Sequence, residues 1–454
     1  MEEKALEEKA LEEKLSGPVP EPDWAAFVAI DWADQKHFWR MAVAGSTKQE
    51  QGELENTPEA VEVWAMELHQ RFGGRAIAVC LEQSRGALVC LLSKYPHLVL
   101  FPVHPKTAAG YRETFAPSGA KSDPSDTASL LDLLLRHRER LRPLKPDTEQ
   151  TRLLQSLVEG RRRLVYEKTR QTNRLTALLK IYFPQVLKWF DDVDSPLVLG
   201  LLESWGSLTE LRRAHPGTLR KFFHEHNCRN EERIQERITA IQQALPATED
   251  RAILEGEGRK ARAAVALLQT LRSQIEEFDQ AIEKVVRVHP ETPIFSSLPG
   301  AGPVLTSRLV AAFGTQRERY ESAYQLQCFS GVAPLTERSG QSQWVHFRWA
   351  CPKFLRQTFQ EFAGHSIAKS TWARAFYDSQ RADHKTHHMA VRALACRWIP
   401  ILFRCWKDQK PYDEQIHLKS LERHNSPLVG ASLLATVGEW KEVAGFKKFC
   451  AKPS

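Results

Sequence analysis

Between Trp24 and Arg142 the apolar residues alternate between the two-residue period of a β-strand and the longer period of a helix. Four segments have the strand pattern: Phe27–Ile30, Phe38–Val43, Ala76–Leu81 and Leu98–Val103. Three have the helix pattern: Pro58–Phe72, Gly86–Tyr95 and Asp123–Leu141, and a further strand can precede the first of these. Strands and helices in this order predict an α/β domain, in which a mixed sheet is flanked by helices.

Two acidic residues stand at the ends of predicted strands. Asp31 directly follows the apolar residues of FVAIDWADQK, and Glu82 follows Ala76–Leu81. A single acid in such a place is more often a turn or capping residue than a catalyst. In α/β sheets, however, active residues gather at the ends of neighbouring strands. We therefore expect these two carboxylates to lie together.

A second acidic pair opens the last helix of this region. In the segment SDPSD, Ser122 or Asp123 can cap the helix and Pro124 fits its first turn. Asp123 and Asp126 are three residues apart, a spacing that projects both side chains from the same side of a helix. The helix dipole alone also favours acids here, so the pair has a structural explanation beside a catalytic one.

Pro143–Pro146 interrupts the chain, and a long helical region follows. Its clearest signal is the a/d seam of a coiled coil, formed by Ala264, Leu268, Leu271, Ile275, Phe278, Ile282 and Val285. Gln150–Lys180 is also predicted to be helical, and its arginines either meet phosphates or are solvated. We interpret the region as a helical hairpin for self-association or for gripping nucleic acid. Residues 183–246 form an interrupted helical insertion to which we assign no role.

The segment Ser296–Gly314 contains a Pro-Gly-x-Gly-Pro turn followed by an amphipathic helix. It resembles a helix-hairpin-helix, in which backbone N–H groups at the glycine-rich turn and the next helix N-terminus contact phosphates. Gly300 and Gly302 are therefore predicted to bind nucleic acid. A plain turn between two helices is the alternative.

Cys328–Gln357 is predicted to hold a polar, basic loop between helical segments. Ser339 precedes Gly340 there, so its hydroxyl can stand exposed in a sharp turn as a nucleophile, although a Ser-Gly pair is also an ordinary turn. Basic residues and aromatic residues are mixed around it: Arg338, Arg348, Lys353 and Arg356 with Trp344, Phe347 and Trp349. Such a mixture suits phosphate contacts and base stacking, while the aromatic residues can equally belong to a core.

The histidines and cysteines are weaker candidates for metal sites. His384, His387 and His388 have helical spacing, but only Asp383 is near enough in sequence to add a further ligand, so we favour a solvated or phosphate-facing cluster. The eight cysteines show no close pairing of the CxxC kind. They are expected to be reduced thiols in the core.

Charge and hydropathy limit the partners. The 454-residue chain has a net charge of +7, and its first fifteen residues, with six Glu and three Lys, leave +10 for the remainder. Such a surplus suits a polyanion. The chain has no apolar run of the roughly 18 residues that a membrane helix needs, and no signal-peptide pattern opens it. We expect no membrane partner and a cytoplasmic location.

Taken together, the motifs resemble the insertion sequence 110 family of transposases. They are AIDWADQKH around Asp31, CLEQSRG around Glu82, KSDPSDT, LPGAGPVLTSRL, and FSGVAPLTERSG with Ser339, in this order between about Phe27 and Glu414. The resemblance implies a RuvC-like, RNase H-type domain with a DEDD tetrad, a coiled-coil middle, and a mainly helical transposase domain with a catalytic serine. The expected domains are 24–145, 146–290 and 291–412, between a charged tail and linker at 1–23 and a C-terminal tail at 413–454.

The resemblance also implies roles for individual residues. Asp31, Glu82, Asp123 and Asp126 would bind Mg²⁺, or Mn²⁺ in its place, and Ser339 would be the nucleophile that forms a phosphoserine link to DNA. The family is known for recombinases guided by a noncoding bridge RNA that pairs with donor and target DNA. In it the serine of one subunit works beside the tetrad of another, which implies a dimer or tetramer that assembles through the coiled coil. We also expect the protein to be bacterial and to be associated with the nucleoid.

Three departures and two other functions stay open. Ser330, Ser342 and Ser366 are alternatives to Ser339, and Ser342 is the strongest of them. The segment after Ser339 lacks the more basic, glycine-containing loop of many relatives, which leaves the DNA-contacting residues uncertain, and the helical middle is longer than the resemblance requires. The other functions are a RuvC-like junction nuclease that uses activated water, and a non-catalytic nucleic-acid-binding protein whose acids only cap helices and turns.

Overall fold

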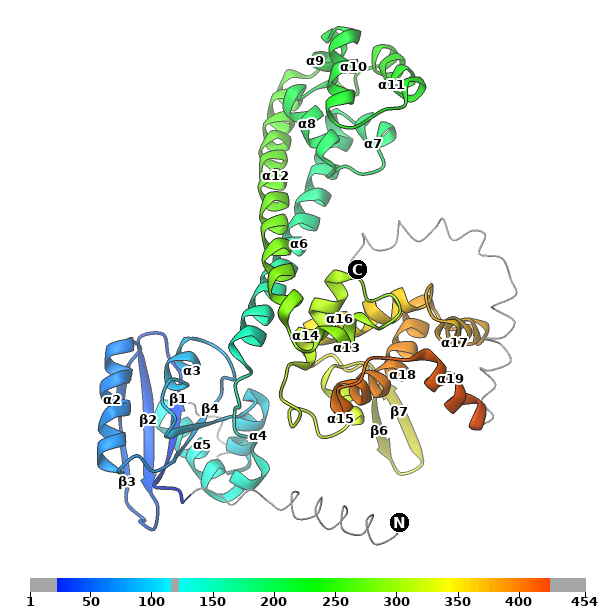
Figure 1. Ribbon diagram of the computed structural model, residues 1–454. Helices are drawn as coiled ribbons and strands as arrows, with labels where there is room; N and C mark the ends of the chain where they lie inside the picture. The colour runs from blue at the N-terminus through cyan, green and yellow to red at the C-terminus, as the bar shows by residue number, and fades with distance from the viewer. Residues whose placement is uncertain (1–22, 116–121, 425–454) are drawn as a thin grey trace. The chain divides into compact units, whose positions relative to one another are not determined.

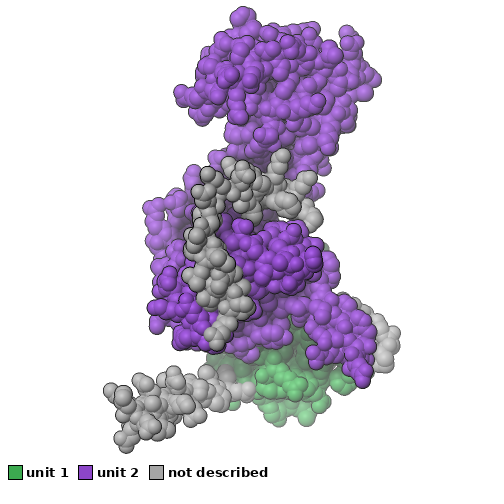
Figure 2. All heavy atoms as spheres, turned by 90° about the vertical axis from the view of Figure 1, so that its right-hand side faces the viewer, with its two compact units in different colours: residues 1–146 green, residues 147–454 purple. Residues whose placement is uncertain are grey.

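The chain folds as two compact units, residues 1–146 and residues 147–454 (Figure 2). The structure is a computed structural model and describes residues 23–115 and 122–424. The predicted N-terminal charged tail, apart from Asp23, and most of the predicted C-terminal tail lie outside the described residues. Each unit is built around its own apolar clusters.

The first unit contains a five-stranded mixed sheet with the strand order β3-β2-β1-β4-β5 (Figure 1). Its strands are β1 (Ala26–Asp31), β2 (Lys36–Val43), β3 (Gln49–Glu55), β4 (Ile77–Leu81) and β5 (Leu98–Pro102). β4 pairs with β1 and β5 in parallel, while β2 is antiparallel to both β1 and β3. The predicted mixed sheet is confirmed, including the additional strand before the first helix.

Helices cover both faces of this sheet. They are α2 (Pro58–Arg71), α3 (Ala87–Leu92), α4 (Pro105–Phe115) and α5 (Asp123–His137), which a short 3-10 turn extends to Arg140. Alternate residues of β1 serve different faces, because side chains along a strand point to opposite sides. Val28 and Ile30 pack into the cluster that holds α2 and α3, whereas Ala29 packs with the leucines of α5. The sequence did not predict α4.

The second unit begins with two long helices, α6 (Glu149–Tyr182) and α12 (Arg251–Val288), which pack along each other (Figure 1). The predicted seam residues Ala264, Leu268, Ile275 and Ile282 are buried. Their partner is α6 of the same chain, so the apolar stripe is already covered without a second subunit. An a/d stripe predicts a partner helix but does not say to which chain that helix belongs.

Five short helices gather at one end of this pair (Figure 1). They are α7 (Val186–Trp189), α8 (Pro196–Ser204), α9 (Leu208–Arg213), α10 (Pro216–Glu225) and α11 (Glu231–Gln243). Side chains of Ser195, Ser207 and Asn230 cap three of them by accepting a backbone N–H, as Ser and Asn do at helix starts. We call this group the tip bundle, and it has an apolar cluster of its own shared with both long helices.

Seven helices and one β-hairpin form the rest of the described second unit. They are α13 (Thr292–Ser296), α14 (Pro303–Phe313), α15 (Ala323–Phe329), β6 (Leu335–Ser339), β7 (Ser342–His346), α16 (Lys353–Ser366), α17 (Thr371–Ala382), α18 (His387–Asp408) and α19 (Glu414–Arg423). The expected mainly helical region is confirmed. Trp372, Trp398 and Trp406 are buried at its centre, so these aromatic residues belong to the core.

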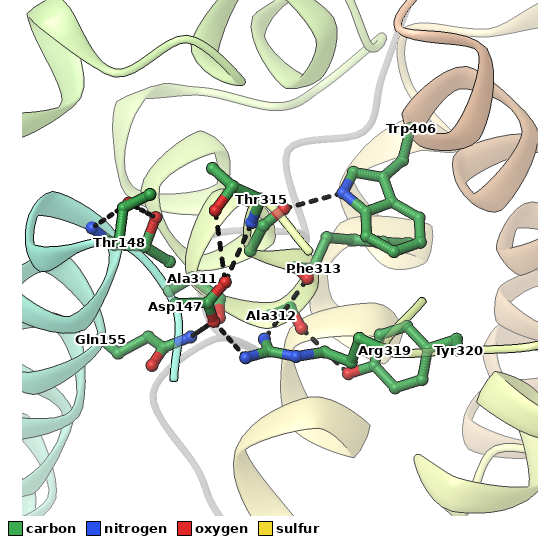
Figure 3. Close-up of polar contacts among 12 residues, drawn as sticks. Asp147, Thr148, Gln155, Ala311, Ala312, Phe313, Thr315, Arg319, Tyr320 and Trp406 are labelled. Carbon is green, nitrogen blue, oxygen red and sulfur yellow. Dashed lines mark hydrogen bonds and ion pairs between the residues drawn. The ribbon is translucent and has the colours of Figure 1, made fainter. Parts of the chain in front are cut away.

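Asp147 fastens the start of α6 to this helical body (Figure 3). Its carboxylate forms an ion pair with Arg319 and accepts hydrogen bonds from the Thr315 backbone N–H at 3.1 Å and from Gln155 Nε2 at 3.2 Å. Nearby, Trp406 Nε1 donates to the Gly314 carbonyl at 2.7 Å. The Asp147 side chain is wholly buried, and a buried charge is tolerated where it is paired and hydrogen-bonded in this way.

None of the helices that the structure describes has both the length and the apolar composition needed to cross a bilayer.

Candidate active site

The parallel pairing of β1 and β4 brings two acidic residues to one edge of the sheet. Ile30 pairs in register with Leu81, and Asp31 and Glu82 are the residues that follow them. Asp31 lies two residues after Ala29, which packs against α5, so the Asp31 side chain is on that face of the sheet. Glu82 lines a small recess with residues of α4 and α5. Together with Asp123 and Asp126 these two residues are called the acidic edge below.

The start of α5 supplies the second acidic pair. Ser122 caps the helix, forms a reciprocal capping box with Ser125, and Pro124 lies in the first turn, as predicted. Asp126 is buried and lines the same recess as Glu82. Asp123 is exposed to solvent at the first helical residue. The structure therefore brings Glu82 and Asp126 together in this recess, while Asp123 lies exposed at the N-terminus of α5.

Arg112 of α4 is the residue of this region that sequence reasoning missed. Its Nη1 lies 2.5 Å from Asp126 Oδ1, and the two side chains are only 20% and 4% exposed. Next to it, Tyr111 donates a hydrogen bond to Asp132 Oδ2 at 2.7 Å, and burial together with this bond raises the pKa of Tyr111 to about 12. Arg112 gave little signal in the sequence because α4 buries only Ala108 and so lacks an apolar stripe.

The donor atoms of the acidic edge are of the type that Mg²⁺ prefers, since hard cations take carboxylate oxygens. Within residues 23–115 and 122–424, however, no group of three or more His, Cys, Asp or Glu side chains is close enough to hold a metal ion. Arg112 supplies a positive charge to the Asp126 carboxylate. The residue types fit a divalent cation, and the four-ligand set remains a prediction.

Ser339 lies in a β-hairpin, and not in the loop between helices that we expected. It ends β6, and its cross-strand partner is Ser342, the first residue of β7. Gly340 in the connecting turn has φ +58°, a left-handed conformation that glycine adopts without strain. We call Leu335–His346 the serine hairpin. Both serines flank its two-residue turn and are exposed, so the structure presents two hydroxyls at one tip.

The other two serine candidates are buried. Ser330 donates its hydroxyl hydrogen to the Gln327 carbonyl at 3.2 Å, and its residue has no exposed surface. Ser366 Oγ donates to the Ala363 carbonyl and accepts from Trp398 Nε1, both at 2.8 Å. Hydroxyls engaged in this way stabilise the core and do not reach a large substrate.

The predicted basic residues lie on and beside the serine hairpin. Arg338 is exposed on β6, and Lys353 is exposed at the start of α16. Arg356 lies over the Phe347 ring, 4.8 Å from its centroid, and donates to the Arg348 carbonyl at 3.3 Å. Two aromatic side chains of the same stretch face solvent, Trp344 at 51% and Trp349 at 79%. Exposed aromatic rings beside cations are what stacking on nucleic acid requires.

The turn before α14 has the predicted helix–turn–helix order, with α13 before it. Gly300 has φ +82°, and a Cβ there would lie 2.7 Å from the His365 carbonyl oxygen, so packing against α16 already requires glycine. Gly302 stands at the N-cap of α14 without a side-chain cap and is exposed. Phosphate binding by these two glycines remains a prediction, which the exposed helix start favours.

Family comparisons match both parts of this arrangement. A DEDD-type model described as "Transposase" matches residues 28–184, and a model described as "Transposase IS116/IS110/IS902 family" matches residues 292–378. The chain is also 26% identical over 406 residues to a Streptomyces coelicolor protein named as transposase of the IS117 mini-circle, covering 87% of this chain and 97% of that protein. The chain belongs to the insertion sequence 110 family of transposases.

Two further members are similar over most of their length. The 43.6 kDa protein of insertion element IS110 from Streptomyces coelicolor is 26% identical over 401 residues, 87% of this chain and 97% of that protein. The 44.8 kDa protein of IS116 from Streptomyces clavuligerus is 26% identical over 392 residues, 85% of this chain and 92% of that protein. The resemblance stated from the sequence is thereby confirmed at the level of the family.

The two family matches cover different parts of this transposase-family chain, and each part contains some of the predicted site residues. The first contains all four residues of the acidic edge, and it suggests a RuvC-like fold for a unit whose five-stranded mixed sheet agrees with one. The second contains Gly300, Gly302 and the serine hairpin. The tip bundle and α12 lie between the two matches.

The histidine cluster of this family member has an internal partner. His387 Nδ1 is 2.9 Å from the Tyr377 hydroxyl, and burial, with the adjacent His388 and Arg381, lowers the pKa of His387. A neutral, hydrogen-bonded imidazole at a helix start agrees with a structural role.

Seven of the eight cysteines lie in the described part of the chain, and all seven are free thiols, as predicted. Cys80 is buried in the sheet, but Cys90 is exposed, so the expectation that all of them are core residues is wrong.

Proposed function

We propose that this chain is the DNA transposase of a mobile insertion sequence, which cuts and rejoins DNA strands through a covalent serine–DNA intermediate. The observation that carries the proposal is the meeting of Glu82 and Asp126 in one recess, while Asp31 follows Ile30, which pairs in register with Leu81 just before Glu82. Caps and turns alone do not require an acid after β4 and an acid of α5 to meet. The exposed hydroxyls at the tip of the serine hairpin supply the nucleophile.

In the proposed reaction Ser339 Oγ attacks the phosphorus of a DNA phosphodiester. The Oγ–P bond forms as one P–O bond to a deoxyribose oxygen breaks, the serine proton is taken by a base, and the departing oxygen is protonated. The number of phosphoester bonds stays constant, so no external energy source is consumed. A hydroxyl of another DNA strand then attacks the phosphoserine, which joins the new strand and restores Ser339.

Asp31, Glu82, Asp123 and Asp126 would hold Mg²⁺, and Mn²⁺ suits the same oxygen donors. When bound, the cation neutralises charge that develops on the phosphate in the transition state. The acids hold it in place and repel stray phosphates when it is absent. Arg112 has to release Asp126 before all of these carboxylates are available.

The partners of the proposed reaction are donor and target DNA, a noncoding guide RNA and further copies of the chain. The surplus of basic residues outside the first fifteen supports nucleic-acid partners. By family resemblance, the serine hairpin of one subunit acts beside the acidic edge of another. Because α6 covers the seam of α12 within the chain, such an oligomer needs surfaces other than that seam.

Trapping on nicked DNA tests the chemistry. A nick next to the scissile phosphate lets the released fragment diffuse away, so a covalent protein–DNA adduct accumulates. We expect the wild-type protein, with its copurifying RNA, and Ser342→Ala to form the adduct, and Ser339→Ala to bind DNA without forming it. Ser342 is the matched control because it pairs with Ser339 across the same turn. An adduct that persists in Ser339→Ala and disappears in Ser342→Ala moves the nucleophile to Ser342. DNA cleavage by the wild type without any adduct would instead identify a nuclease that uses water.

A further inference from the structure

A cavity of about 860 Å³ lies beside the serine hairpin within the helical body of the second unit. Its walls come from the end of β7 and the residues that follow, from the loop Gly331–Pro334, and from α17, α18 and α19. Val345 lines the cavity and lies three residues after Ser342, a distance of about 10 Å along a strand. One wall of the cavity therefore lies within about 10 Å of Ser342, and its volume is in the range of small-ligand sites.

The lining of this cavity is largely aromatic and aliphatic. Phe347, Trp372, Phe376 and Met389 contribute to it, and none of its lining residues is acidic. Aromatic faces that line an open cavity are suited to stack on a flat, apolar ring system. A purely apolar cavity would be lined by such side chains alone, whereas this cavity is also lined by several basic side chains.

Arginines surround the aromatic wall. Arg392 lies over the Phe347 ring at 4.3 Å from its centroid, and Arg397 lies over Phe376 at 5.5 Å. Together with Arg348 they line the cavity, and Arg356 contacts Phe347 from outside it. Within the described residues, none of these four arginines has an ion pair with an acidic side chain closer than 4 Å. The Nε atoms of Arg348 and Arg392 are buried and, among those residues, without a hydrogen-bond partner.

Burial and the clustering of arginines disfavour the charged form of Arg392. Burial and the nearby charge of Arg356 lower the pKa of its guanidinium, which means that its charged form is disfavoured where it stands. An anion bound between these arginines would relieve that repulsion, because guanidinium forks match phosphate oxygens.

We infer that this cavity receives one unstacked base of the DNA strand beside the serine hairpin, with the phosphate of that nucleotide held by Arg392 and Arg348. A ring system joined to an anion is the chemistry that an aromatic wall rimmed with unpaired arginines fits, and a nucleotide has both parts. A duplex cannot enter, so the base has to leave its stack. The choice of DNA rests on the proposed function, since Ser339 is proposed to attack DNA.

Binding of oligonucleotides tests the inference without any chemistry. The probes are a fluorescein-labelled single-stranded 12-mer of deoxythymidines, a 12-mer in which every position is abasic, and a duplex of equal length, each titrated against the full chain. We expect the wild type to bind the base-containing strand about tenfold more tightly than the abasic strand, because stacking on aromatic side chains depends on the bases.

Two opposite changes to the cavity should remove that preference. Ala393→Phe fills the cavity and leaves every arginine in place, and Phe347→Ala removes a stacking surface. Both are expected to bind the two single strands equally, at the affinity that the wild type has for the abasic strand. Arg392→Gln should weaken both strands about equally, whereas Arg404→Gln, on the same helix but outside the cavity, should match the wild type. Thermal melting checks that each variant is folded.

An unchanged tenfold preference in folded Ala393→Phe and Phe347→Ala overturns the inference. So does a cavity occupied by a second copy of the chain, which would appear as a dimer that Ala393→Phe dissociates. A ribose 12-mer tests the choice of DNA. If Ala393→Phe and Phe347→Ala lose the preference for bases as expected, but the wild type binds the ribose 12-mer tenfold more tightly than the deoxyribose 12-mer, the choice of DNA is overturned. Failure of the proposed function is seen separately, as absence of the covalent adduct in a wild-type protein that still prefers the base-containing strand.

Discussion

Asp126 of the acidic edge is 4% exposed and rests against a sheet that helices cover on both faces, whereas every residue of β6 and β7 except Leu335 is exposed. Asp126 is thus positioned by the core of the first unit. The two strands of the serine hairpin pair with each other, and a lone two-stranded hairpin is marginally stable in water. The comparison teaches that the core of the first unit fixes Asp126, while the serine hairpin presents both of its hydroxyls to solvent.

The largest effect should come from the ordered side of this comparison. Asp31→Asn keeps the shape of the side chain and removes its charge, so adduct formation on nicked DNA should fall by about 1000-fold, the scale of lost transition-state stabilisation. Thermal melting should change little, because the residue is only half-buried at a strand end. Glu53→Gln, in an exposed ion pair on β3 of the same sheet, is the control and should be active. Wild-type adduct levels in Asp31→Asn would reduce the acidic edge to turn and capping residues.

The second prediction concerns the body that carries the serine hairpin. Asp147→Ala should lower the free energy of unfolding by about 3 kcal/mol, because it leaves Arg319 and Thr315 without their buried acceptor. Urea denaturation followed by tryptophan fluorescence measures the loss. Asp378→Ala breaks an exposed pair with Arg374 and should cost less than about 1 kcal/mol. Equal losses for the two variants would mean that the anchor at Asp147 does not hold the body rigid.

The third prediction tests the exposed side of the comparison. Trp344→Ala should weaken binding of single-stranded DNA about tenfold, the contribution of one stacked base, and change stability by less than about 0.5 kcal/mol. Tyr166→Ala removes another exposed aromatic side chain, on α6, and should affect neither property. A clear loss of stability in Trp344→Ala would show that the hairpin packs against the protein itself, and the contrast with the acidic edge would disappear.

The fourth prediction concerns Arg112, which lines the recess that holds Glu82 and Asp126. Arg112→Gln frees Asp126 from its ion pair and should strengthen Mn²⁺ binding to the full chain about tenfold, measured by the paramagnetic resonance signal of the free ion. The control is Arg136→Gln, which breaks the exposed ion pair between Arg136 and Asp132 on α5, the helix that carries Asp126. It should leave the affinity for Mn²⁺ unchanged. Weaker binding in Arg112→Gln would mean that the arginine organises the acids and does not compete with the metal.

The sequence predicted the ordered region well because burial leaves a pattern. β1 and β4 are apolar runs that end at Asp31 and Glu82, and the capped start of α5 follows directly from Ser122 and Pro124. Arg112 was not predicted because α4 has a single buried residue, Ala108, and therefore no apolar stripe that would mark it as a helix. Its pairing with Asp126 depends on how two helices pack, which no local pattern encodes.

The serine hairpin was wrongly expected to be a loop, because strands without a buried face leave no pattern in the sequence. LTERS and SQWVH have no buried face, so no alternation of apolar and polar residues marks them as strands. The cavity beside them joins residues from positions 327 to 421, and such a site arises only when the chain has folded. The seam of α12 was recognised, yet its periodicity could not say that α6 of the same chain covers it.

The 34-residue α6 packed along α12 also sets a length. At 1.5 Å per residue, α6 extends over about 50 Å, close to fifteen base pairs of duplex DNA at 3.4 Å each. Two paired helices bend far less than a linker of the same number of residues. A partner that bound the tip bundle would therefore be held at a set distance from the helices around α14, and equal deletions in α6 and α12 would shorten that distance by about 1.5 Å for each residue removed.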